Sequence, residues 1–168
     1  LDRTIRRTRG NLKNIREQAA LPPEERSDRS WPRPWTWVGP MVNLMTGGPV
    51  PLWHGQLHTA RFRYFDPERR RPGISEGCAA LVETLTDEAA TLTLVNTDPE
   101  KPHTVLVQTG AYAEHRCVSV TPEGGEPVPV NAPVFLVTLA PGTGRRLEVK
   151  MTRYANTPTL AFPWQRTQ

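Results

Sequence analysis

The clearest pattern along the chain is an alternation of apolar and polar positions that begins after its first third. In the first alternating segment, Ala60, Phe62 and Tyr64 are separated by polar residues, so they share one face of an extended strand. The last such segment, residues 146–151, alternates in the same way. One apolar face and one polar face are typical of strands in an antiparallel sheet that packs on one side only.

Between these two segments lie further short apolar runs, most of them closed by turn residues such as Asp-Pro or Gly-Gly. Many short strands without alternating helices favour an antiparallel β-sandwich of about seven to eight strands and exclude a parallel sheet. Pro129 lacks the backbone N–H that a central strand needs, so its strand is predicted at a sheet edge. The expected strands are 59–65, 91–97, 104–108, 117–120, 128–130, 134–139 and 146–151.

One short helix is predicted among the strands, directly after a charged turn. Ser75 is placed to cap its first turn, and the apolar residues that follow recur at helical spacing. Cys117 is expected in a strand, and we expect both cysteines to be free thiols that pack as small apolar side chains. The helical apolar positions are Cys78, Leu81, Val82 and Leu85.

Residues 1–56 differ in composition from the rest of the chain. Residues 1–20 are predicted to form a short basic helix with a narrow apolar stripe. Residues 21–56 form a connector rich in proline, glycine and tryptophan, which we expect to be irregular. We therefore divide the chain into this leading part, interpreted as the end of an upstream domain, and a β-sandwich domain at 57–168.

The overall composition agrees with a small β domain that carries an arm. The 168 residues include 18 prolines and 12 glycines, more than a helical bundle would carry. No apolar stretch approaches the roughly 18 residues that a membrane helix needs, so we expect no membrane partner. The chain starts at Leu1 without a visible leader, and we expect it to be a piece of a longer protein.

The net charge of +4 is concentrated at the start of the chain. Residues 1–16 contain six basic residues and one acidic residue, a net charge of +5, which leaves −1 for the remainder. A basic arm of this kind is compatible with a nucleic-acid partner. No aromatic residue within the arm is available to stack on bases, however, so nucleic acid is not the expected partner.

The connector carries four of the five tryptophans, which makes it the strongest candidate for a binding surface. Leaving four indoles in water would expose a large apolar area, at a cost of about 25 cal/mol per Å². Two interpretations stay open. The indoles pack against another domain, which we favour, or they stack on sugar rings as a carbohydrate-binding platform. The residues concerned are Trp31, Arg33, Trp35, Trp37 and Trp53.

Other polar residues suggest chemistry less strongly. His54 and His58 have the spacing of helical metal ligands. In a strand they would lie about 13 Å apart, at roughly 3.3 Å per residue, so no metal or cofactor is expected. Glu114 and His115, near Tyr112, suggest acid–base catalysis in a small β enzyme. Adjacent residues of an extended segment point to opposite faces, so we expect these two not to act together.

The glycine-containing connections and the C-terminal tail also have predictable conformations. The glycine segments 124–125 and 142–144 each join two predicted strands, whereas a phosphate-binding loop opens a helix. Both are therefore expected to be hairpin turns. The tail, residues 154–164, is extended but still apolar, and we expect it to pack back onto the sandwich.

Segments 91–99 and 135–150, with the turn at 140–142, resemble the C-terminal β-sandwich domains that close large bacterial glycoside-hydrolase-like proteins. The resemblance covers residues 57–164 and lies in the order of strands and turns. In such proteins the catalytic acids lie in a preceding barrel, so the resemblance implies no catalytic residue here. It also implies a carbohydrate-active parent protein, a structural or docking role, and a partner that is an upstream domain or a companion chain.

Overall fold

The computed structural model describes residues 6, 9–10, 12–13, 16–17, 19–25, 39–48 and 59–166. The chain divides into two compact units, Leu1–Val42 and Asn43–Gln168. All strands of the described residues lie in the second unit. The candidate site described below also belongs entirely to this second unit.

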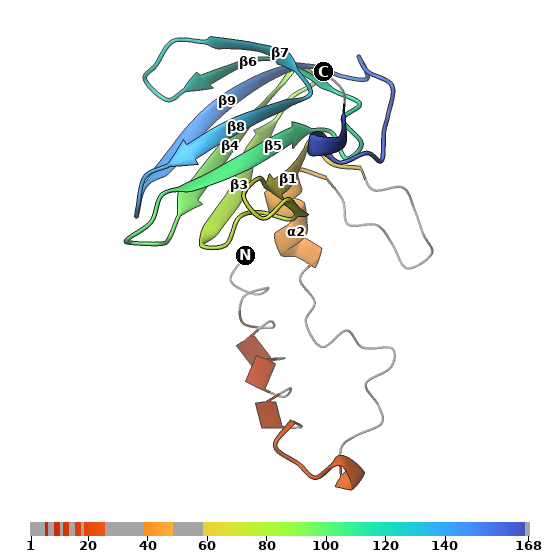
Figure 1. The fold of residues 1–168 in the computed structure, drawn as a ribbon, viewed down its shortest axis with the longest axis vertical. Helices are drawn as coiled ribbons and strands as arrows, with labels where there is room; N and C mark the ends of the chain where they lie inside the picture. The colour runs from red at the N-terminus through yellow and green to blue at the C-terminus, as the bar shows by residue number, and fades with distance from the viewer. Residues whose placement is uncertain are drawn as a thin grey trace. The chain divides into compact units, whose positions relative to one another are not determined.

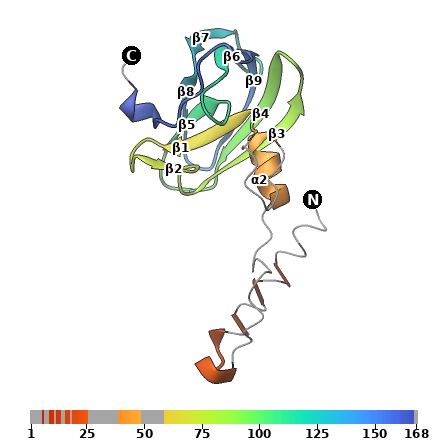
Figure 2. The same ribbon diagram turned by 90° about the vertical axis from the view of Figure 1, so that its right-hand side faces the viewer.

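Nine strands of the described residues form two antiparallel sheets, seen as two layers in Figure 1 and Figure 2. The four-stranded sheet consists, in spatial order, of β2 (Arg71–Pro72), β1 (Phe62–Asp66), β5 (His103–Thr109) and β8 (Val134–Leu139). The five-stranded sheet consists, in spatial order, of β3 (Cys78–Leu85), β4 (Ala89–Asn96), β9 (Gly144–Thr152), β6 (Arg116–Pro122) and β7 (Val128–Ala132). This confirms the predicted mainly-β antiparallel sandwich. The strand that contains Pro129 lies at a sheet edge, as predicted.

The core fills the space between the two sheets. Ala60, Phe62 and Tyr64 are buried, and so are the alternate residues of β9, as the period-two pattern predicted. Burying one such large apolar side chain contributes about 1.5–3 kcal/mol relative to leaving it in water. The core residues are Phe62, Tyr64, Val105, Val107, Phe135, Val137 and Leu139 from one sheet, and Val82, Ala90, Leu92, Leu94, Cys117, Val120, Leu147, Val149 and Met151 from the other.

The predicted helix after Ser75 is wrong, because this segment is strand β3. It pairs along its length with β4, from Cys78 opposite Asn96 to Leu85 opposite Ala90. Ser75 does not cap a helix but donates a hydrogen bond to the carbonyl of Thr104 at 2.7 Å. A short run of apolar residues is compatible with both helical and strand spacing. Here the segment forms a strand because its backbone groups pair with those of β4.

The first unit is partly helical. The described positions between residues 6 and 19 are helical, in agreement with the predicted basic helix. Lys13 and Glu17 form an ion pair at 3.8 Å, one turn apart. The connector contains regular structure that the sequence did not predict: the 3₁₀ turn η1 (Pro23–Glu25), and α2 (Gly39–Thr46), which ends in the second unit.

The two glycine connections differ from each other. Gly124 lies at the β6–β7 hairpin with φ +71°, as predicted. The segment 142–144 is not a hairpin, because β8 and β9 belong to different sheets and the chain crosses between them there. Gly142 has φ +62°, and its amide donates to the carbonyl of Asp98 at 2.8 Å, which fixes this crossing against the β4–β5 loop.

The C-terminal tail packs back onto the sandwich, as predicted. It ends in the 3₁₀ turn η2 (Pro163–Gln165), beside β1 and β5 in Figure 1 and Figure 2. The Trp164 ring meets the Phe65 ring edge to face, with 5.7 Å between centroids, and Phe162 lies 6.3 Å from Phe65. Phe65 is fully buried although it faces away from the core. The tail therefore covers the outer face of the four-stranded sheet.

Candidate functional site

The residues proposed as a carbohydrate platform lie outside the described residues. They are Trp31, Arg33, Trp35, Trp37 and Trp53. The candidate metal ligands His54 and His58 lie outside the described residues as well. The candidate site that the structure describes is built around Glu114 and His115.

Glu114 and His115 lie close together, contrary to the expectation that they point to opposite faces. The His115 Nε2 and the Glu114 Oε1 are 3.9 Å apart. The reason is that residues 110–115 form a tight turn and not an extended segment. Ala113 adopts left-handed backbone with φ +59°, which costs about 1–2 kcal/mol for a non-glycine residue. The two side chains are nearly buried, with 11% exposure for Glu114 and 3% for His115.

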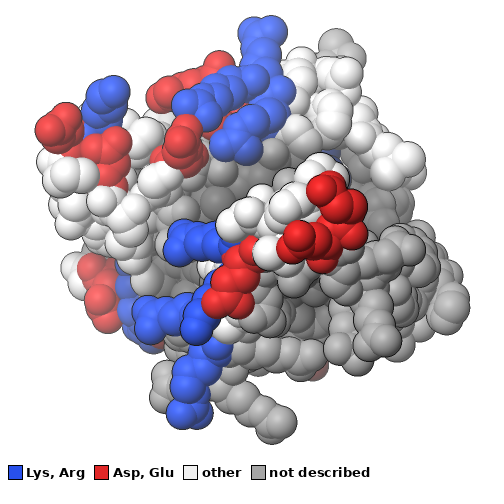
Figure 3. Space-filling model, turned by 90° about the horizontal axis from the view of Figure 1, so that it is seen from below, with Lys and Arg blue, Asp and Glu red and all other residues white. Residues whose placement is uncertain are grey.

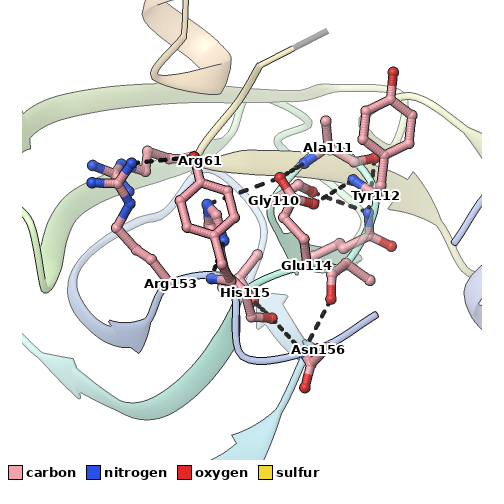
Figure 4. A network of polar contacts seen from close by, with 12 residues as sticks. Arg61, Gly110, Ala111, Tyr112, Glu114, His115, Arg153 and Asn156 are labelled. Atoms are coloured by element: carbon pink, nitrogen blue, oxygen red, sulfur yellow. Dashed lines mark hydrogen bonds and ion pairs between the residues drawn. The ribbon is translucent and has the colours of Figure 1, made fainter. Parts of the chain in front are cut away.

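The Glu114 carboxylate closes this turn from the inside. It accepts hydrogen bonds from the backbone amides of Ala111, at 3.3 Å, and Tyr112, at 2.7 Å (Figure 4). Gly110 makes room for the carboxylate, because a Cβ at this position would lie 2.3 Å from Glu114 Oε2. Gly110 also has φ +86°, which glycine tolerates best. Both oxygens of Glu114 are thus engaged in holding the 110–115 turn.

The His115 ring is held in one tautomer by its hydrogen bond. The backbone amide of Tyr154 donates to His115 Nδ1 at 3.1 Å, so Nδ1 carries no proton and the ring proton is on Nε2. The Tyr154 ring meets the imidazole edge to face at 4.9 Å. The lone pair that a general base needs is therefore occupied by a backbone donor. His115 connects the turn to Tyr154, two residues beyond the end of β9.

The electrostatic surroundings keep His115 neutral. Burial is the largest cause that lowers the pKa of His115 below its ordinary value of 6.5. The Glu114 carboxylate acts in the opposite direction and raises it. The guanidinium groups of Arg61 and Arg153 lower the His115 pKa further, because they repel a positive imidazolium. The net direction is downward, so the neutral ring is favoured.

The first residues of the tail form hydrogen bonds with the same turn, both from backbone amides and from the Asn156 side chain. The Asn156 side-chain amide donates to the carbonyls of Ala113, at 3.0 Å, and His115, at 2.9 Å. The Asn156 backbone amide donates to the Glu114 carbonyl at 3.2 Å. Further along, the amide of Thr159 donates to the Tyr112 carbonyl at 2.8 Å. We call this set of contacts between residues 154–159 and the 110–115 turn the tail clamp.

A pocket of about 180 Å³ opens beside the tail clamp. It is smaller than the roughly 300–1,000 Å³ typical of small-molecule sites. In the view of Figure 4, Arg61 and Arg153 lie to one side of His115, and Glu114 with its turn lies to the other. The lining residues with charged, aromatic or large apolar side chains are Arg61, Leu85, Glu114, His115, Arg153 and Tyr154.

A second acidic–histidine pair joins the β4–β5 loop, which contains Asp98, to His103, the first residue of β5. The His103 Nε2 is 3.1 Å from the Asp98 Oδ2. Backbone amides of Glu100 and Lys101 also donate to Asp98, and the Glu100 amide is the largest cause that lowers the Asp98 pKa, to about 2. The Asp98 carboxylate therefore shapes this loop through its backbone hydrogen bonds.

The remaining chemistry-bearing groups are dispersed in the described part of the chain. No three His, Cys, Asp or Glu side chains cluster there in a way that would hold a metal ion. Cys78 and Cys117 are free thiols, as expected, and burial raises the pKa of Cys117 to about 12. None of the described helices is both long enough and apolar enough to cross a bilayer.

Comparison with protein-family models, with curated proteins and with solved structures gives no match to this chain. The resemblance to glycoside-hydrolase-associated sandwiches therefore stays a prediction from the sequence. Sequence reasoning missed the tail clamp, because it treated Glu114 and His115 as part of an extended segment. Gly110 was the signal that a turn begins there.

Proposed function

We propose that this chain is a non-catalytic β-sandwich module, the C-terminal part of a larger carbohydrate-active protein, which it serves by structural support and interdomain docking. The observation that carries the proposal is the tail clamp. In the turn that the tail clamp holds, the Glu114 and His115 side chains, which a catalytic hypothesis would need, are engaged in backbone hydrogen bonds at both carboxylate oxygens and at Nδ1.

The charge distribution is compatible with this role. Within the second unit, exposed acidic and basic side chains form ion pairs, as in Arg69 with Glu76 and Arg146 with Glu83, and Figure 3 shows side chains of both signs among the described residues. A surface of mixed sign favours docking to a protein over binding a polyanion such as nucleic acid.

The test is activity and binding of the purified full chain. We expect no hydrolysis of a panel of aryl glycosides at any pH between 4 and 9, whereas turnover that the purified chain itself retains would contradict the proposal. We also expect that adding the upstream part of the parent protein raises the melting temperature of the chain. No rise, and no complex in size-exclusion chromatography, would contradict the docking role.

A fluorescence titration separates the proposal from the carbohydrate-binding interpretation. A structural role for the connector tryptophans predicts no saturable change in tryptophan emission when oligosaccharides are added. The substitution Trp35→Ala is the matched variant. Saturable quenching that W35A abolishes while the domain stays folded would replace the docking role by carbohydrate binding.

A further inference from the structure

Two arginines of the second unit converge on the pocket beside His115. Arg61 directly precedes β1, and Arg153 directly follows β9, so the two come from different sheets. Arg61 donates through Nη2 to the Thr86 carbonyl at 3.2 Å. Arg153 donates through Nη2 to the Tyr154 hydroxyl at 3.4 Å, and its guanidinium carbon lies 5.2 Å from the Tyr154 ring centroid.

Each guanidinium also carries a buried nitrogen that is left without a partner. These atoms are Arg61 Nη1 and Arg153 Nε, and neither has a hydrogen-bond acceptor within the described chain. A buried donor without an acceptor is energetically unfavourable, and more so when the donor is charged. Both arginine side chains line one pocket, so an acceptor bound there would lie next to two guanidiniums that each have an unpaired N–H group.

The two guanidiniums repel each other at this place. Burial lowers the pKa of Arg61, and the neighbouring Arg153 charge lowers it further. An anion between the two guanidiniums would offset this repulsion and would accept hydrogen bonds from the unpaired N–H groups. Arginine is suited to this because its planar fork binds the two oxygens of a carboxylate or phosphate together.

The acidic residues nearby do not already fill this role. Glu114 lines the pocket, but its oxygens are held by the amides of the 110–115 turn. The Asp87 carboxylate lies 3.5 Å from Arg153 Nη1, at the limit of a hydrogen bond, and its side chain is 98% exposed. An exposed pair of this kind contributes little and leaves Arg153 Nε unpaired.

We propose that Arg61 and Arg153 form a binding site for a single oxyanion, a carboxylate or phosphate group, in the pocket beside His115. The pocket volume of about 180 Å³ suits one such group and is too small for a typical small-molecule ligand. The oxyanion has two chemical sources, a free phosphate-bearing molecule or an acidic side chain of a docking protein. The existence of this anion site does not depend on the accessory role proposed above.

The test is NMR titration of the full chain, observing the arginine side-chain Nε–H signals. The probe is inorganic phosphate at constant ionic strength, with sodium chloride as the reference titration. We expect saturable shifts of the Arg61 and Arg153 signals and none at Arg145, an exposed arginine of β9. Shifts that rise linearly without saturation, or that chloride reproduces in full, would overturn the proposal.

Variants locate the site. Arg153→Gln is expected to weaken phosphate binding about tenfold or more, since it removes one charged fork. Arg145→Gln, the matched control, should leave the affinity unchanged. If R153Q does not fold, Arg153→Lys keeps the charge and removes the fork, and its affinity should still fall. Unchanged affinity in both R153K and the Arg61→Lys variant would contradict the assignment.

The two sources of the oxyanion are separated by a second probe. N-acetyl-glutamate amide, which presents a side-chain carboxylate, is titrated under the same conditions. Tighter binding of this probe than of phosphate assigns the site to an acidic residue of a docking protein. Tighter binding of phosphate assigns it to a phosphate-bearing small molecule. Saturation by neither probe would show that the site does not exist.

Discussion

The outer faces of the two sheets are completed in different ways. On the five-stranded sheet, β9 presents Arg146, Glu148 and Lys150 to water, as its alternation predicts. On the four-stranded sheet, Phe65 and Gln108 also point outward, yet both are fully buried. The C-terminal tail provides this burial.

The covered face extends into the candidate site. Gln108 accepts a hydrogen bond from Arg166 Nη2 at 2.6 Å and donates to the carbonyls of Gly110 and Ala111, at 3.1 and 3.2 Å. The same tail segment thus covers Phe65 and holds the 110–115 turn. The outer face of the five-stranded sheet is in contact with solvent, whereas the outer face of the four-stranded sheet is covered by tail residues that are distant in sequence.

The largest expected effect is on the covered face. Phe65→Ala should lower the free energy of unfolding by about 3–5 kcal/mol, because it leaves a cavity beneath Phe162 and Trp164. Leu81→Ala on β3, where Leu81 is 41% exposed, should change it by at most about 1 kcal/mol. Urea denaturation of the full chain measures both. Equal losses in the two variants would show that the tail does not stabilise the sheet.

The next effect is at the turn that the tail clamp holds. Gly110→Ala should destabilise the chain by about 1–3 kcal/mol, because the methyl group would collide with Glu114 and the backbone would be strained. Gly124→Ala is the control, since Gly124 has a similar positive φ but open space around it. Thermal unfolding should show a clearly larger loss for G110A. Similar losses would mean that strain alone, and not the carboxylate, makes glycine necessary.

A smaller effect is expected from pH. The unfolded chain protonates His115 near its ordinary pKa of 6.5, while burial lowers the pKa in the folded chain. Stability from this group is therefore complete above about pH 6.5 and is lost as the pH falls below it, by up to about 1.4 kcal/mol per unit of pKa difference. Denaturation at pH 7.5 and pH 5.0 measures the loss, which His115→Gln should reduce. If the loss of stability between pH 7.5 and pH 5.0 is the same in H115Q as in the unmodified chain, this assignment is contradicted.

The smallest effect is expected on the solvent-exposed outer face of the five-stranded sheet. Arg146 Nε lies 2.9 Å from the Glu83 carboxylate, and its Nη1 lies 3.3 Å from that of Glu123. These groups are exposed, so solvent and salt screen their attraction. Arg146→Gln should leave the melting temperature almost unchanged at 150 mM salt. A loss as large as that of G110A would mean that this face is also stabilised by specific contacts.

The sandwich was predictable because the alternation of apolar and polar residues along the strands indicates which side chains face the core. The same principle failed at β3, where apolar residues stand close together and Leu81 and Leu85 point to solvent. It also left Phe65 unexplained, because Phe65 follows Tyr64 directly and the two cannot share a face. Two adjacent buried aromatic residues in a strand were the signal that both faces of this sheet are covered.

The tail clamp was not predictable from local patterns. Ala113 and Tyr154, with φ +59° and φ +54°, adopt left-handed backbone without being glycine or asparagine. Only the assembled hydrogen bonds of Glu114, His115 and Asn156 compensate for that cost. The pocket arginines were equally hidden, because Arg61 and Arg153 are remote in sequence and meet through the fold alone.

The central claim is that the tail is a fixed part of the sandwich and holds the 110–115 turn. Hydrogen exchange of the full chain tests it directly at the amides of Asn156 and Thr159, which bond to the carbonyls of Glu114 and Tyr112. Both amides are expected to exchange as slowly as those of β5, in the same cooperative unit. Exchange at the rate of an unprotected amide, while β5 stays protected, would contradict it.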